Sequence, residues 1–447
     1  MGLTIVQKSN LRAPRKHAPN IALVLAGGAI SGGAFKLGGL IALNTYLENK
    51  KVTDFQMYVG VSAGAFLAAP LSAGVPPEEL IRSIHGRSSI ITQFRPIHFY
   101  YPNFSEFLSK PVDLVHDAVT FFPEVSRTLW RSMSSTEGKR RFRRFMSQPS
   151  YPNLELLMAP VIRDVLGVAD LERSGLSYLP SGLFDNTPIE HFIRENLRRN
   201  RLPNNFRLMH LERHNSLYIT ATNLNTAKVA LFGHDEDTSA TISEAVQAST
   251  AIPGYFRPVR IAGEEYVDGG VRRTANISRA SQKGADLIIC YNPFRPIVYH
   301  PDRRPGSKQR SMGEMGPAMV LNQVFRTLLH SRLELGVERL ALEPRFKGDL
   351  LVIEPTETDA RMFNISPLAF WKRAEAAEAG FLSAKQTIER HHEKLAPIFE
   401  AYGIRTNLKR LKEDETALRL ARDHDEEVFE VLQHDAEAPR PHLQIVR

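Results

Sequence analysis

The chain has 447 residues, of which 43% are hydrophobic and 24% are charged, a composition typical of globular proteins. That composition excludes a disordered or fibrous protein, and the single cysteine, Cys290, excludes an intrachain disulfide. The formal net charge of +8 is modest for this length, but the basic residues are unevenly distributed.

Residues 1–19 are polar and basic and contain no apolar run that would suit a signal peptide. We predict a flexible tail for this segment. The stretch from Met57 to Val75 carries no charge, but its total hydrophobicity is too low for a membrane span. We therefore expect a cytoplasmic protein without a signal peptide or a transmembrane helix.

The first elements alternate between strand and helix patterns. A short apolar strand from Ile21 to Leu25 runs into a glycine-rich turn, and a helix is predicted from Ala34 to Leu47. A second strand, from Phe55 to Val61, leads into a second helix that starts after Ser62. Successive strand–turn–helix units predict an α/β fold, a three-layer α/β/α sandwich with a mainly parallel central sheet.

The rest of the chain supplies further strands and many helices. Residues 76–210 are mostly helical in character, and the aromatic stretch 104–130 is either ordinary core or a cap. Strands are predicted at 217–222, 228–232, 265–267, 287–291 and 350–354. A polar loop at 301–316 precedes predicted helices at 318–342 and 368–391, and the last forty residues read as a charged tail.

Two basic clusters stand out. The first surrounds Phe142 and comprises Lys139, Arg140, Arg141, Arg143 and Arg144, and the second comprises Arg194, Arg198, Arg199 and Arg201. Such clusters attract anionic lipid or nucleic acid, although a solvated helix face explains them equally well. Because no nucleic-acid motif accompanies them, we expect peripheral contact with an anionic membrane and no nucleic acid.

The segment Gly60-Val61-Ser62-Ala63-Gly64 fits the G-x-S-x-G pattern, between a predicted strand and a predicted helix. A nucleophilic serine needs a tight turn that exposes its hydroxyl, and the flanking glycines Gly60 and Gly64 let backbones approach closely. The N-terminus of the following helix favours developing negative charge. The pattern therefore predicts Ser62 as a nucleophile, with a structural turn as the alternative.

The earlier turn, from Ala26 to Gly33, presents several backbone N–H groups without obstructing side chains. Such donors suit an oxyanion hole, for which we select Gly27, Gly28, Ala29 and Gly32. Phosphate binding in a dinucleotide fold uses the same device. Ala29 breaks the G-x-G-x-x-G pattern of that fold, but Asp54 lies at a suitable distance downstream, so this segment alone leaves both interpretations open.

A third motif, Asp268-Gly269-Gly270, places a carboxylate at the end of a short predicted strand. A tight hairpin is the alternative explanation, yet a carboxylate within reach of a serine can act as its base. The three segments, in this order, resemble the patatin-like phospholipase family. The stretches 182–188, 248–254 and 284–286 also look like family signatures, so the resemblance covers about residues 20–300.

The resemblance implies a catalytic dyad of Ser62 and Asp268, supported by Gly269 and Gly270, and an oxyanion hole from the glycine-rich loop. It further implies hydrolysis of lipid acyl esters without a metal or other cofactor. We assign residues 20–300 to the catalytic domain and 301–447 to a mainly helical region that packs on it. The loop departs from the family pattern at Ala29, which replaces a glycine, and at Ser31, which replaces a basic residue.

Three rival interpretations remain at this stage. A Ser–His–Asp triad would draw its histidine from His300 or His330, which follow Asp268 in the chain. A nucleotide- or dinucleotide-binding enzyme explains the glycine-rich turn but leaves the other two motifs unexplained. A catalytically silent scaffold would use only the basic clusters to bind membranes.

Overall fold

The computed structural model describes residues 2–12, 18–106, 130–131, 134–148, 180–298, 311–356, 359, 365 and 367–414. The chain divides into two compact units. The first comprises Met1–Tyr101, Asn186–Pro253 and Pro258–Arg447, and the second comprises Pro102–Asp185 and Gly254–Arg257.

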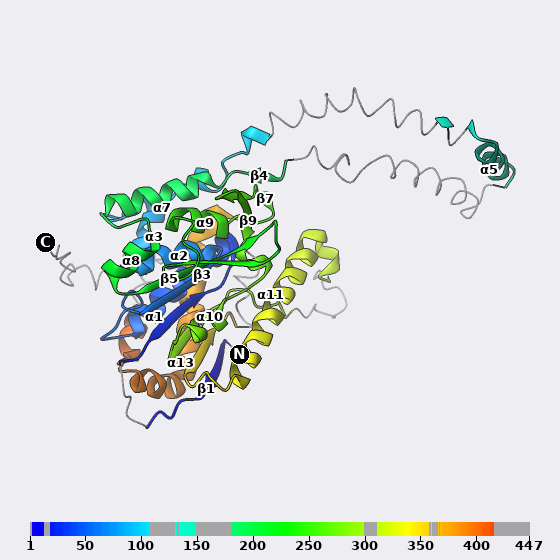
Figure 1. Ribbon diagram of the computed structural model, residues 1–447. Helices are drawn as coiled ribbons and strands as arrows, with labels where there is room; N and C mark the ends of the chain where they lie inside the picture. The colour runs from blue at the N-terminus through cyan, green and yellow to red at the C-terminus, as the bar shows by residue number, and fades with distance from the viewer. Residues whose placement is uncertain are drawn as a thin grey trace, which may run out of the picture. The chain divides into compact units, whose positions relative to one another are not determined.

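A sheet of nine described strands forms the centre of the first unit (Figure 1). The strands run in the order β1-β11-β10-β2-β3-β5-β9-β8, and β6 also pairs with β5. Their bounds are β1 (Leu3–Gln7), β2 (Ile21–Leu25), β3 (Met57–Val61), β5 (Ser216–Asn223), β6 (Val229–Gly233), β8 (Val259–Ile261), β9 (Glu264–Asp268), β10 (Leu287–Tyr291) and β11 (Asp349–Ile353). The neighbours from β11 to β5 are parallel, which confirms the predicted α/β fold with a mainly parallel sheet.

Helices cover both faces of this sheet. Alternate residues of a strand point to opposite sides, and each side of these buried strands packs against a helix layer. Ile277 of α10 and Leu333 of α11 pack with Val24 and Cys290 on one face. On the other face, Phe35 of α1 contacts the ring of Tyr291. The described helices of this unit are α1 (Ala29–Tyr46), α2 (Ala63–Ser72), α3 (Pro77–His85), α7 (Thr187–Arg199), α8 (Phe206–Arg213), α9 (Ile242–Ser249), α10 (Ile277–Gln282), α11 (Pro317–Leu342) and α13 (Arg373–Ala401), with short 3₁₀ turns η1 (Pro96–His98), η4 (Gly269–Val271), η5 (Gly313–Met315) and η6 (Phe370–Lys372).

The N-terminal segment differs from the predicted flexible tail, because Leu3–Gln7 forms the edge strand β1. This strand pairs antiparallel with β11, so that Leu3 lies opposite Ile353 and Gln7 opposite Asp349. Thr4, Ile5 and Val6 have high strand propensity, so the segment carried a short local strand signal that the prediction of a tail overlooked. Together with β11, this strand extends the sheet on the far side of β10.

The second unit is described only in part. Its helix α5 (Thr136–Ser147) begins at Ser135, whose side chain accepts a hydrogen bond from the Gly138 N–H. Strands β4 (Gly182–Phe184) and β7 (Gly254–Phe256) form a parallel pair. Much of the predicted stretch 104–130, of the loop 301–316 and of the charged tail lies outside the described residues. Among the helices that are described, none combines the length and the apolar character needed to cross a bilayer.

Candidate active site

Ser62 occupies a strained turn between strand β3 and helix α2. Its φ of 55° lies in the left-handed region, which residues with a side chain rarely adopt. The backbone N–H of Ser62 donates to Ser249 Oγ at 2.8 Å, and that hydroxyl donates to the Thr220 carbonyl at 2.7 Å. Helix α9 and strand β5 therefore hold the serine in this conformation.

The two motif glycines beside Ser62 are explained by close backbone contacts. A Cβ atom on Gly64 would lie 2.1 Å from the Leu25 carbonyl oxygen, and one on Gly60 would lie 2.5 Å from the Ala65 Cα. Because backbone atoms cannot move aside without displacing β2 or α2, neither position has room for a side chain. The sequence pattern around the serine is thus required by the packing of this turn.

Asp268 ends strand β9 next to Ser62, although the two residues are distant in sequence. The Ser62 hydroxyl lies close enough to the Asp268 carboxyl to favour its ionised form and lower its pKa. Asp268 Oδ1 also accepts the Gly270 N–H at 2.6 Å. A Cβ atom on Gly269 would lie 2.2 Å from the Thr220 carbonyl oxygen, which explains the glycine that follows the aspartate.

Burial raises the pKa of Asp268 from 3.8 to about 6. Hydrogen bonds from Ser62 and from the Gly270 N–H, together with the positive charge of Lys36, oppose this shift. The side chain is only 6% exposed. A carboxylate with this pKa is mostly ionised at neutral pH and is a stronger base than one in water.

Two of the four predicted oxyanion donors are already engaged. The Gly27 N–H donates to the Thr274 carbonyl at 3.2 Å, and the Gly32 N–H donates to the Gly28 carbonyl at 2.9 Å. The assignment of Gly27 and Gly32 as free donors is therefore wrong, because helix α1 begins at Ala29 and uses the Gly32 N–H for its first turn.

The other two predicted donors lie at the N-terminus of α1. Within the part of the chain that the structure describes, the N–H groups of Gly28 and Ala29 have no acceptor, whereas the next two, of Ile30 and Ser31, both donate to the Pro367 carbonyl at 3.0 Å. Ala29 has a φ of 50°, so it adopts the conformation for which glycine is suited. Gly28 and Ala29 thus offer adjacent donors near the helix N-terminus.

A buried cation that the sequence analysis did not assign lies beneath this loop. Lys36 of α1 is fully buried, and its Nζ donates to the carbonyls of Ala26 and Gly27, the latter at 2.9 Å. It is the only charged residue of an 18-residue helix. A single lysine in an otherwise uncharged helix was the signal in the sequence that could have indicated a buried role for Lys36.

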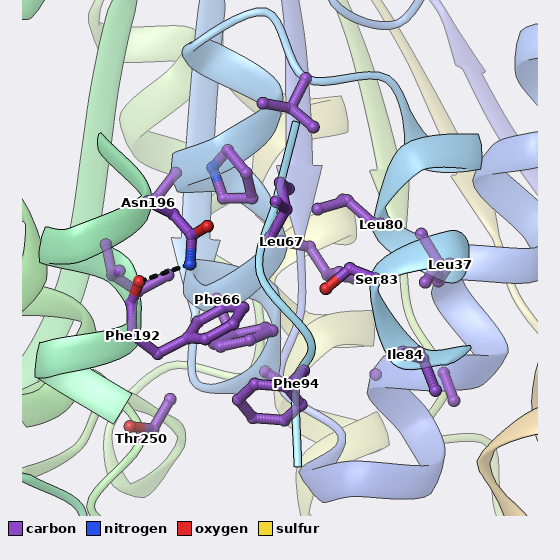
Figure 2. Close-up of a pocket in the computed structure, with 18 of the residues that line it drawn as sticks. Leu37, Phe66, Leu67, Leu80, Ser83, Ile84, Phe94, Phe192, Asn196 and Thr250 are labelled. Carbon is purple, nitrogen blue, oxygen red and sulfur yellow. Dashed lines mark hydrogen bonds between the residues drawn. The ribbon is translucent and has the colours of Figure 1, made fainter. Parts of the chain in front are cut away.

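An apolar cavity extends from Ser62 and Ala29, with about 1120 Å³ of empty space that includes space open to solvent. Its wall carries a cluster of aromatic rings, in which the centroids of Phe94 and Phe192 lie 4.7 Å apart (Figure 2). Other apolar residues of the wall are Leu37, Phe66, Leu67, Leu80, Ile84, Ile193 and Leu197.

Polar groups in the cavity wall are largely satisfied by the protein itself. The Asn196 side chain donates to the Phe192 carbonyl at 2.7 Å (Figure 2). It also donates to Thr92 Oγ1 at 2.9 Å. The Arg373 guanidinium lies over the Phe370 ring, 4.4 Å from its centroid. The cavity therefore suits a hydrocarbon chain better than a polar ligand.

The histidines considered as a third catalytic residue do not support a triad. The two ring nitrogens of His330 face Glu354 at 3.2 Å and Glu334 at 3.4 Å. His300 lies outside the described residues. Among the described contacts of the Asp268 side chain are the Gly270 N–H, whose hydrogen bond it accepts, and the Ser62 hydroxyl, which lowers its pKa, but no histidine.

Comparison with known proteins gives one family and several similar structures. Residues 23–281, more than half of the chain, match the family model described as patatin-like phospholipase. The chain is similar to VipD from Legionella pneumophila, with 17% identity, a TM-score of 0.37, and coverage of 97% of this chain and 85% of that one. It is also similar to ExoU of Pseudomonas aeruginosa in complex with SpcU, with 15% identity, a TM-score of 0.27, and coverage of 99% and 71%.

Proposed function

Because this chain belongs to the patatin-like phospholipase family, we propose that it is a lipid acyl hydrolase that cleaves carboxylic esters through Ser62 and Asp268. One observation carries the proposal. A serine in a strained backbone conformation lies beside a buried carboxylate whose pKa it lowers, at the edge of an apolar cavity. Strained, buried polar groups cost stability, and they are concentrated at functional sites.

In the proposed reaction, Asp268 accepts the hydroxyl proton of Ser62 as the serine oxygen attacks the ester carbonyl. The N–H groups of Gly28 and Ala29 donate to the oxyanion of the tetrahedral intermediate. Asp268 then gives the proton to the leaving alcohol, and an acyl-enzyme remains. Water hydrolyses the acyl-enzyme by the same steps in reverse, which restores the serine.

The cavity supports an acyl chain as the group that is bound next to Ser62. Its wall is formed mainly by aliphatic and aromatic side chains, and the Asn196 amide is occupied by protein acceptors. Each CH₂ group that enters such a wall contributes about 0.8 kcal/mol of binding. We therefore expect KM to fall as the acyl chain of the substrate becomes longer.

Helix α5 supports the proposed contact with an anionic membrane. Within the described part of the chain, the ion pairs of its basic residues are with Glu137, which lies 3.8 Å from Arg140 and 3.4 Å from Arg141. Phe142 and Met146 are 46% and 65% exposed on the same helix. A helix with exposed apolar side chains and an excess of arginines is suited to the surface of an anionic bilayer.

A fluorophosphonate probe and p-nitrophenyl esters of increasing chain length test the activity. Wild type should be labelled by the probe and should hydrolyse the esters, whereas Ser62→Ala should lose both activities. Ser72→Ala is a matched control, because Ser72 is buried at the C-terminal end of α2, the helix that follows Ser62, and its hydroxyl donates to the Ala69 carbonyl. Normal ester turnover by Ser62→Ala would disprove the assignment.

A further inference from the structure

Lys36 lies in a place where an ammonium group is costly. It is fully buried, and burial lowers the pKa of its amine to about 7. The titratable groups that favour the charged form of Lys36 are Asp268 and Cys290. Burial raises the pKa of the Cys290 thiol, so it is neutral at pH 7 and Asp268 is the only one of the two that carries a charge. An unpaired buried cation destabilises a fold by several kcal/mol, so its presence requires an explanation.

The contacts of Lys36 determine how the glycine-rich loop is oriented. In a trans peptide unit the carbonyl and the following N–H point in opposite directions. Lys36 binds the Gly27 carbonyl at 2.9 Å, so the Gly28 N–H, which belongs to the same peptide plane, points away from Lys36. Apart from this ammonium group, the described residues offer no donor to the Gly27 carbonyl.

Hydrogen bonds also fix the two peptide units on either side, Ala26–Gly27 and Gly28–Ala29. The Ala26 carbonyl accepts from Lys36, while the Gly27 N–H donates to Thr274. The Gly28 carbonyl accepts the Gly32 N–H, which turns the Ala29 N–H away from the helix. A Cβ atom on Gly27 would lie 3.4 Å from the Ser62 Cβ, so these peptides lie directly beside the nucleophile.

We propose that Lys36 is a positioning residue of the hydrolase: it fixes the Gly27–Gly28 peptide so that the Gly28 N–H serves as an oxyanion donor, and its charge favours ionised Asp268. This inference rests on the proposed ester hydrolysis at Ser62. It also supplies, from the second turn of α1, a positive charge that the loop lacks at Ser31. Lys36 acts through the loop and Asp268 and does not touch the substrate.

The hydrogen bond from Lys36 to the loop and the positive charge of Lys36 should affect the kinetics differently. Loss of the amine that holds Gly27 leaves the Gly28 donor misaligned, which weakens binding of the transition state but not of the ground state. Loss of the charge removes an interaction that lowers the pKa of Asp268. Because Asp268 must be ionised to act as a base, the acidic limb of the pH profile should then move to higher pH.

The full chain with Lys36→Met provides the test, because methionine has similar length but no donor and no charge. With a soluble p-nitrophenyl ester, we expect kcat to fall roughly 10- to 1000-fold with KM within about threefold of wild type. The acidic limb, near pH 6 in wild type, should shift upward. Binding of a trifluoromethyl ketone, which forms an oxyanion with the serine, should weaken in parallel with kcat.

A second variant, Lys36→Gln, separates donor from charge and serves as the test if Lys36→Met does not fold. Its amide should restore part of kcat while the acidic limb stays displaced. A folded variant with wild-type kcat and an unshifted limb would overturn the role of Lys36. The proposed function fails separately, if wild type neither reacts with the fluorophosphonate probe nor hydrolyses the ester.

Discussion

Individual residues of this site are held in states that oppose stability. Ser62 has a positive φ, and Asp268 carries a carboxylate in a nearly solvent-free place. Neither feature improves the packing of the fold, and each costs on the order of 1–3 kcal/mol. Both costs are expected for a reactive serine and a base whose pKa is raised toward neutrality.

Replacing Asp268 by asparagine should therefore stabilise the protein at neutral pH while abolishing ester hydrolysis. The folded-state pKa, about 6, lies above the unfolded value of 3.8, so the folded protein binds an additional proton between these values. The wild-type free energy of unfolding thus falls as pH rises through this window, and the full loss is present above pH 6. Asparagine does not titrate, so its advantage should be roughly 1–3 kcal/mol at pH 8 and should shrink toward pH 4.

Urea unfolding of both proteins from pH 4 to pH 8 measures this difference. Asp235→Asn is a control of opposite sign: burial raises the pKa of Asp235, but hydrogen bonds from Lys283 and Tyr218 outweigh this and lower it. That substitution should destabilise the protein at neutral pH. An Asp268→Asn variant that is less stable than wild type at pH 8 would contradict the prediction.

The sequence predicted the central pair of residues but not their supporting contacts. Ser62 and Asp268 are each preceded by a strand and followed by glycines that backbone contacts require, so short motifs are informative there. The donors Gly27 and Gly32 were wrong because a residue type does not reveal where its backbone N–H already donates. Ser249 was missed for the same reason, since its contact with the Ser62 N–H joins segments 187 residues apart.

Among the described elements, helices α1 and α13 form the most extensive contact. Both helices were predicted from local patterns, but their pairing joins residues near 38 with residues near 380, which no local pattern reveals. Gly38 faces the backbone of Ala377, and Gly380 faces the backbone of Phe35. Glycine on each helix therefore permits an approach that any side chain would prevent. The pairing of the edge strand β1 with β11 is equally distant in sequence, although the residues of β1 themselves favour a strand.

Adding a single methyl group at this contact should be strongly destabilising. A Cβ atom on Gly38 would lie 1.8 Å from the Ala377 carbonyl oxygen, and one on Gly380 would lie 1.9 Å from the Phe35 carbonyl oxygen. Gly38→Ala or Gly380→Ala must push the helices apart, at a cost of about 1–3 kcal/mol or more. Because α1 carries Lys36 and begins at Ala29, ester hydrolysis should also decline.

Gly336→Ala on α11 is the matched control, since its Cβ would meet only Ile277 at an ordinary 3.6 Å. Alanine is the better helix former, so this change should raise the free energy of unfolding by up to about 1 kcal/mol. Urea denaturation of the three variants provides the comparison. Equal stability of Gly38→Ala and wild type would show that the two helices are not packed this closely.

On the scale of the whole molecule, two helices carry clustered basic residues, and they differ in how this charge is compensated. On α7, Arg194 lies 2.9 Å from Glu190, and Arg198 lies 3.6 Å from Glu195. On α5, five basic residues share the single acid Glu137. The sequence showed both basic clusters but not which of them is less compensated by acidic neighbours, because ion pairing between side chains depends on the folded helix.

Reversing three charges on α5 should therefore weaken membrane binding more than the same reversal in the second basic cluster, at the end of α7 and just beyond it. Arg140→Glu/Arg143→Glu/Arg144→Glu removes basic groups that each contribute about 1 kcal/mol near an anionic surface, so binding to phosphatidylserine vesicles should fall roughly 100-fold or more. Because this attraction is screened, binding of wild type should also decline as salt increases. Vesicle sedimentation measures both effects, and hydrolysis of a soluble ester should stay unchanged because α5 contributes no residue to the cavity.

The charge-matched control is Arg198→Glu/Arg199→Glu/Arg201→Glu, which alters the net charge equally. Equal loss of binding by the two variants would mean that total charge, rather than the exposed face of α5, determines contact with the membrane.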